Sequence, residues 1–135
     1  MGASGANLFE DDASMDWLEG YRASGAGAVA SALDTAAGTP VTDYLDMDQG
    51  AAARAAAEVV AVAHGAFPSG MSQDRLDLLN AHGSDVRAMD SIKSRATSAL
   101  DRLISENSEL HEVWMDSDAQ SDWVAAMNDL RRRLG

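Results

Sequence analysis

The sequence predicts an all-α fold, arranged as a single compact domain of about six helices with a short irregular N-terminal arm. Apolar residues recur at steps of three and four through the C-terminal half, which is the period of an amphipathic helix. Residues 51–63 include eight alanines, and alanine has the highest helix propensity. Aromatic residues make up only 5% of the chain, so the core relies on small and aliphatic side chains, which suit packed helices better than a sheet.

The order of the helices follows from the apolar spacing and from the Gly and Pro residues between the helices. A chain of 135 residues suits one domain, which we assign to 1–135 with the arm at 1–11. Ala13, Trp17 and Tyr21 share one face of the first helix. The expected ranges are 12–21, 28–37, 51–63, 71–81 and 86–104, then a brief helix at 109–115 and a final helix ending at Leu134.

The alanine-rich segment 51–63 is expected to be the central buried helix. Its small side chains let neighbouring helices approach closely, and Gly65 and Pro68 end it. Arg54 and Glu58 are expected to point away from the buried face.

The C-terminal helices carry the clearest pattern. For the helix over 86–104, Ser84 is the expected N-cap and Asn107 the expected stop. Ser117 and Gln120 have the spacing of a capping box before the final helix. The apolar face of that final helix is expected to consist of Trp123, Met127, Leu130 and Leu134.

The charge is large and uneven. The formal net charge is −12, and residues 106–129 hold seven acids with no Lys or Arg. Nucleic-acid binding requires the opposite sign, so we expect no nucleic-acid partner. A basic protein is the better electrostatic match, although solubility alone also accounts for an acidic surface.

Composition and motifs also limit the function classes. The chain has no cysteine, no run of ~18 apolar residues that would span a membrane, and no basic leader, so we expect a cytoplasmic protein without a membrane partner. Neither a Gly-x-Ser-x-Gly elbow nor a phosphate loop occurs, and His111-Glu112 lacks the second His of a zinc protease helix. We therefore expect no cofactor and favour a role without catalysis.

The first helix carries three carboxylates on one face. Asp12, Asp16 and Glu19 stand at i, i+4 and i+7, and such oxygens are ligands that Mg²⁺ or Ca²⁺ prefers. The alternative is that the acids near the start of the helix are stabilised by the positive end of the helix dipole and that the others are solvated.

The brief helix at 109–115 and the turn after it combine one aromatic residue with several acids. A tryptophan on an apolar stripe packs into a core, whereas an exposed tryptophan ringed by acids is a good anchor for a basic partner. The residues predicted to bind a partner are Glu109, Glu112, Trp114, Asp116 and Asp118.

The N-terminus carries a pattern of glycines, aromatic residues and acids, at Gly2, Gly5, Phe9, Asp11, Asp12, Asp16 and Trp17. In this pattern the chain resembles the bacterial family known as domain of unknown function 4259. Further matches lie at 44–45, 55–61 and 107–110, and at Trp114, Trp123 and 129–131. Ser4 stands where the family usually has Trp. The resemblance implies a domain that covers most of the chain, and it implies no activity.

Together these observations predict a small acidic protein-binding module, such as an immunity-like protein or an inhibitor that covers the basic site of a nuclease. The first alternative is a divalent-metal protein or enzyme that uses the first-helix carboxylates. The second is a structural or oligomer-forming domain, which an exposed apolar stripe would favour. The sequence does not define the oligomeric state.

Overall fold

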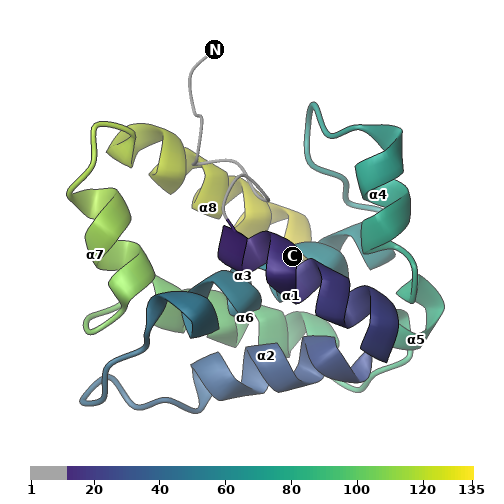
Figure 1. The fold of residues 1–135 in the computed structure, drawn as a ribbon, viewed down its shortest axis with the longest axis horizontal. Helices are drawn as coiled ribbons and strands as arrows, with labels where there is room; N and C mark the ends of the chain where they lie inside the picture. The colour runs from purple at the N-terminus through teal and green to yellow at the C-terminus, as the bar shows by residue number, and fades with distance from the viewer. Residues whose placement is uncertain (1–11) are drawn as a thin grey trace.

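The alanine-rich helix lies at the centre of the computed structural model, which describes residues 12–135. This helix, α3, packs against each of the other seven helices of that part of the chain (Figure 1). The helices are α1 (Asp12–Ser24), α2 (Gly27–Ala37), α3 (Met47–Ala63), α4 (Gln73–Leu79), α5 (Gly83–Arg87), α6 (Ile92–Leu103), α7 (Glu109–Met115) and α8 (Gln120–Leu134). The all-α prediction is confirmed, but residues 12–135 form eight helices and not about six. The predicted arm at 1–11, with Gly2, Gly5, Phe9 and Asp11, lies outside the described residues.

Helix α3 is buried after its first turn, and this corrects the prediction for its charged residues. Arg54 is 7% exposed and Glu58 is 4% exposed. Other helices pack around this part of α3, so it has no solvent face for these side chains. Glu58 instead accepts hydrogen bonds from Arg133 of α8, whose Nη2 lies 3.0 Å from Glu58 Oε1.

The helix predicted over 86–104 is divided into α5 and α6. Ser91 adopts a left-handed conformation with φ 55°, which a continuous α-helix does not permit. Ser84 was expected to cap this helix but lies inside α5, where His82 precedes the first turn without a side-chain cap. Asn107 also has φ 55° and lies beyond Leu103, the last residue of α6. The spacing of the apolar residues predicted the apolar face of this segment, but it did not predict the break that divides the segment into two helices.

Helix α8 buries the predicted face, because Trp123, Met127, Leu130 and Leu134 are all 5% exposed or less. The predicted capping box does not form. Helix α8 begins after Ala119 without a side-chain cap. The hydroxyl of Ser117 donates to the carbonyl of Trp114 at 2.8 Å and accepts from the N–H of Ala119 at 3.2 Å. It therefore connects the end of α7 to the residue before α8 and does not cap the first turn of α8.

The first helix is attached to α4 through the buried ring of Tyr21. The Tyr21 hydroxyl donates to the Leu79 carbonyl at 2.7 Å and accepts from the backbone N–H of His82 at 3.0 Å. Burial raises the pKa of this phenol. Trp17 stacks on Tyr21 with 5.5 Å between the ring centroids, so the aromatic face predicted for the first helix packs against the core.

Two long connections, α2–α3 and α6–α7, are joined by one buried guanidinium group. Arg102 is 6% exposed and lies near the end of α6. Beside it, the N–H of Leu45 donates to Asn107 and the N–H of Glu109 donates to Leu45, which forms an isolated parallel bridge. Arg102 donates to the backbone carbonyls of Thr39, Pro40, Asp43, Glu106 and Asn107. We call this arrangement the Arg102 clamp, and it fixes where α7 begins.

No helix among residues 12–135 is long and apolar enough to cross a lipid bilayer.

Candidate functional site

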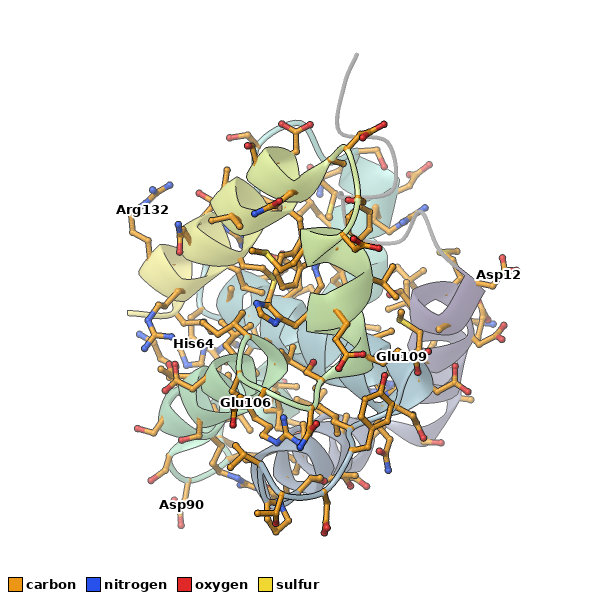
Figure 2. All side chains as sticks on the ribbon, turned by 90° about the vertical axis from the view of Figure 1, so that its left-hand side faces the viewer. Asp12, His64, Asp90, Glu106, Glu109 and Arg132 are labelled. Carbon is orange, nitrogen blue, oxygen red and sulfur yellow. The ribbon has the colours of Figure 1, made fainter. Side chains whose placement is uncertain are left out.

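The predicted partner-binding residues begin at the first turn of α7, where Glu109 has a structural role. The side chain of Ser108 caps α7 by accepting from the N–H of His111. Glu109 Oε1 accepts from the backbone N–H of Met47 at 2.8 Å, which is the first residue of α3. A carboxylate at that position accepts from an N–H group that has no acceptor within the helix. Its negative charge is also stabilised by the positive end of the α3 dipole. Glu109 is therefore engaged inside the molecule (Figure 2).

Glu112 lies one turn further along α7 and contacts the α2–α3 connection. The hydroxyl of Tyr44 donates to Glu112 Oε1 at 2.8 Å. This hydrogen bond, followed by partial burial and the negative charges of Glu112 and Glu109, raises the pKa of Tyr44 to about 12. The bond joins two exposed side chains from segments 68 residues apart, so Glu112 contributes to the same junction as the Arg102 clamp.

Trp114 faces a cavity and not the surrounding acids. It is half-buried, packs against the core, and lines a cavity of about 300 Å³ between α1, α3 and α7. We call this the α1–α7 cavity, and its other main lining residues are Met47, Ala51, Arg54, Leu110 and Val113. The three tryptophans thus all contact the core, with Trp123 buried and the other two partly exposed.

Asp116 and Asp118 are the members of the predicted set that face solvent in the turn between α7 and α8. Two exposed apolar side chains flank this turn in sequence, with Val113 47% and Val124 38% exposed. We call Asp116 and Asp118 the acidic turn. The structure therefore divides the predicted set into two acids that bond to other segments of the fold, of which Glu112 is exposed, one core-packing aromatic and the two exposed acids of the turn.

Within the described part of the chain, the first-helix carboxylates do not gather into a set with other possible metal ligands. Asp12 and Asp16 are exposed, and Glu19 accepts from Arg22 at 2.8 Å. Across residues 12–135, no group of three or more His, Cys, Asp or Glu side chains is arranged to hold a metal ion. Asp12 and Arg132 lie toward opposite edges of Figure 2, so the dense acids of α1 are remote from the arginines that close the chain.

Many of the cationic side chains are already engaged by acids of the same chain. Arg22, Arg95 and Arg131 bind Glu19, Asp34 and Asp101, respectively. Arg132 and Arg133 bind Asp129, and Arg133 also binds Glu58. Because these pairs neutralise charge locally, the excess of negative charge is left to other acids at the surface.

A second cavity, which sequence reasoning missed, lies between α6, α7 and α8. It measures about 220 Å³, and we call it the α8 cavity. Its apolar lining comprises Leu100, Ile104, Met115, Trp123, Val124 and Met127, and His111, Asn128 and Arg131 add polar groups. Val124, Asn128 and Arg131 stand at i, i+4 and i+7, so their shared face was visible in the sequence. The contribution of α6 and α7 was not.

These features define a small acidic all-helical domain in which the described residues line the α1–α7 cavity and the α8 cavity. The chain belongs to the family described as Domain of unknown function (DUF4259), whose model matches residues 2–126. The suspected family is thereby confirmed. No curated protein and no solved structure matches the chain.

Proposed function

We propose that the protein binds a basic protein partner through its acidic surface, with the acidic turn as a main contact. The observation that carries this proposal is the exposure of Asp116 and Asp118 in a molecule of net charge −12 whose arginines are largely paired internally. Complementary charge accelerates the encounter of two proteins and favours partners of opposite sign.

The surroundings of the acidic turn support a protein partner over a small cation. Val113 and Val124 are large exposed apolar side chains close to it in sequence. Apolar contacts between charged groups are typical of protein interfaces, in which a desolvated centre is surrounded by a polar rim. The partner would therefore present basic residues together with at least one apolar side chain. An immunity-like or inhibitor-like role fits this description.

The structure changes how this function is tested. Reversing Glu109 or Glu112 would remove hydrogen bonds to Met47 and Tyr44, so a loss of binding would be confounded by a changed fold. The informative variant is Asp116→Lys with Asp118→Lys. The matched control, which we call the α4 control, is Asp74→Lys with Asp85→Lys. It makes the same charge change at exposed positions of α4 and α5, on the opposite side of the molecule from α7 in Figure 1.

The experiment is affinity capture from a lysate of the source organism with the wild-type protein and both variants, followed by association kinetics with the captured protein. We expect a basic protein to be retained by the wild type and the α4 control and to associate at least about tenfold more slowly with the acidic-turn variant at low salt. Equal association rates for the two variants would contradict the acidic turn as the contact. A wild-type capture that matches the tag alone would contradict the function itself.

A further inference from the structure

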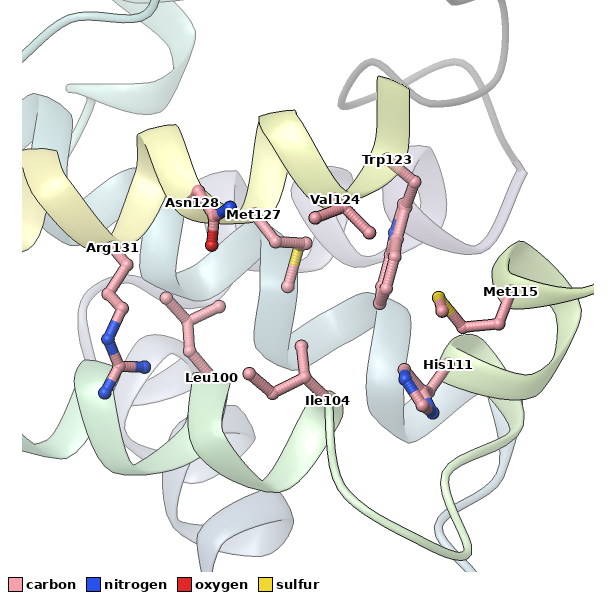
Figure 3. A pocket seen from close by; sticks show the side chains of 9 residues that line it. All are labelled: Leu100, Ile104, His111, Met115, Trp123, Val124, Met127, Asn128 and Arg131. Atoms are coloured by element: carbon pink, nitrogen blue, oxygen red, sulfur yellow. The ribbon is translucent and has the colours of Figure 1, made fainter. Parts of the chain in front are cut away.

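The α8 cavity has the size and lining of a site for a small apolar molecule. It opens between α6, α7 and α8 beside Ile104, which is 42% exposed, and Val124 (Figure 3). An apolar cavity of ~150 Å³ holds a benzene molecule, so the 220 Å³ present here suits a single ring with a short substituent. Met115 and Met127 contribute flexible, polarisable side chains that adapt to the shape of an occupant.

One polar group of a residue that lines this cavity has no hydrogen-bond partner among the described residues. Trp123 is 1% exposed, and its indole Nε1 makes no hydrogen bond within the described part of the chain. Buried indole N–H groups usually find an acceptor, and an unpaired one calls for an explanation. The ring contacts His111, with 5.9 Å between the ring centroids, so a second polar side chain borders the same space.

The indole nitrogen is itself buried, although the Trp123 side chain lines the cavity. Met127, which stands four residues after Trp123 on α8, lines the same cavity (Figure 3). An acceptor in the cavity therefore bonds to Nε1 only after a side chain of the wall moves, and the unbranched Met127 side chain has the rotamer freedom for such a movement.

The charges around the cavity restrict the ligand further. Arg131 at one end is held by Asp101, so its guanidinium is not a free anion site. The whole chain carries a net charge of −12, which opposes the approach of an anion. The donor offered by Trp123 is neutral.

We propose that the α8 cavity binds a neutral, largely apolar molecule of about one ring, whose single hydrogen-bond acceptor pairs with the indole N–H of Trp123. This site is independent of the acidic turn and of the proposed protein partner. The class includes aromatic and aliphatic ketones, aldehydes and esters of small size.

The test is a titration of the ¹⁵N-labelled full-length protein with acetophenone, followed by the indole N–H signals of its three tryptophans. The matched probe is α-methylstyrene, which has the same shape but carries a methylene group in place of the carbonyl oxygen. Trp123→Phe assigns the Trp123 signal. We expect acetophenone to move that signal downfield with saturation, and to bind about five- to tenfold more tightly than α-methylstyrene.

A pair of surface variants controls for the position of the site. Ile104→Phe narrows the cavity mouth and is expected to weaken acetophenone binding at least about fivefold. Val41→Phe makes a similar change at another exposed position, 47% exposed, and is expected to leave binding unchanged. Equal affinity for both probes would overturn the acceptor contact. A Trp123 signal that does not move, or equal effects of the two Phe variants, would overturn the site.

Discussion

Two regions of this molecule each bury a guanidinium group, and they do so in opposite ways. In the Arg102 clamp, the cation is surrounded by neutral backbone carbonyls from two connections. At the contact of α3 with α8, Arg133 lies between two carboxylates, Glu58 and Asp129, with its Nε 2.8 Å from Asp129. The clamp fixes loops by hydrogen bonds alone, whereas the α3–α8 contact joins helices by opposite charge.

The difference shows which of the two contacts can be replaced by apolar side chains. A buried ion pair can be exchanged for apolar side chains of similar volume with little loss of stability. Backbone carbonyls cannot be removed by substitution, so the loss of Arg102 takes a charged donor from each of them, although Pro40 and Asn107 keep the N–H donors of Asp43 and Leu45. The loop junction therefore depends on one side chain, and the helix contact depends on a pair.

The largest expected effect is that of Arg102→Ala. It removes several hydrogen bonds that a charged donor makes to two connections at once, so we expect the free energy of unfolding to fall by about 4 kcal/mol. Urea denaturation with linear extrapolation measures this change. Arg102→Lys keeps the charge but offers fewer donors in a different geometry, and it should recover less than half of the loss. A loss below about 1 kcal/mol for the Ala variant would mean that the loops hold their conformation without the clamp.

The second largest effect is expected for Glu58→Gln. We expect the free energy of unfolding to fall by about 3 kcal/mol, because Arg133 then keeps only one of its two carboxylate partners. The same denaturation experiment applies to the double variant Glu58→Leu, Arg133→Met. We expect this variant to recover most of the loss, since an apolar pair needs no counter-charge. If the double variant is as unstable as Glu58→Gln, the helix contact resembles the clamp and the comparison fails.

The smallest effect concerns Tyr44, which joins the α2–α3 connection to α7 beside the clamp. Its pKa in the folded protein is raised from 10.0 to about 12. A raised folded pKa means that the Tyr44–Glu112 bond contributes its stability below pH 10 and loses it as the pH rises toward 12. Tyr44→Phe should therefore lower the stability slightly at neutral pH and flatten its decline between these pH values. Denaturation series at pH 9 and 11.5 for both proteins check this, and identical declines would exclude the bond as the cause.

The sequence was most informative where one helix face decides the outcome. The four apolar residues of α8 from Trp123 to Leu134 are buried as predicted, because their spacing alone defines the face. The alanine run likewise predicted the central helix. The division at Ser91 was not visible, because no Gly or Pro marks the left-handed residue. Ser117 and Gln120 had the capping-box spacing, but the hydroxyl found an acceptor in the preceding turn.

The candidate site was less predictable because its contacts join distant segments. Glu109 bonds to Met47 across 62 residues, and Glu58 pairs with Arg133 across 75. Local sequence places a charged residue on a helix but does not show which other segment will cover it. Each of these acids was therefore expected to face solvent. Asp116 and Asp118, in the turn between α7 and α8, do face solvent.

The alanines of α3 also have a thermodynamic consequence for how the core is assembled. An alanine side chain has no rotamers to lose, so burying it costs no side-chain conformational entropy. Helix α3 places many such residues at the position where all other helices meet, and the larger side chains, such as Leu33 and Trp123, come from its neighbours. The most crowded part of the molecule is thus ordered at the lowest entropic cost, and a chain with few aromatic residues still closes a complete core.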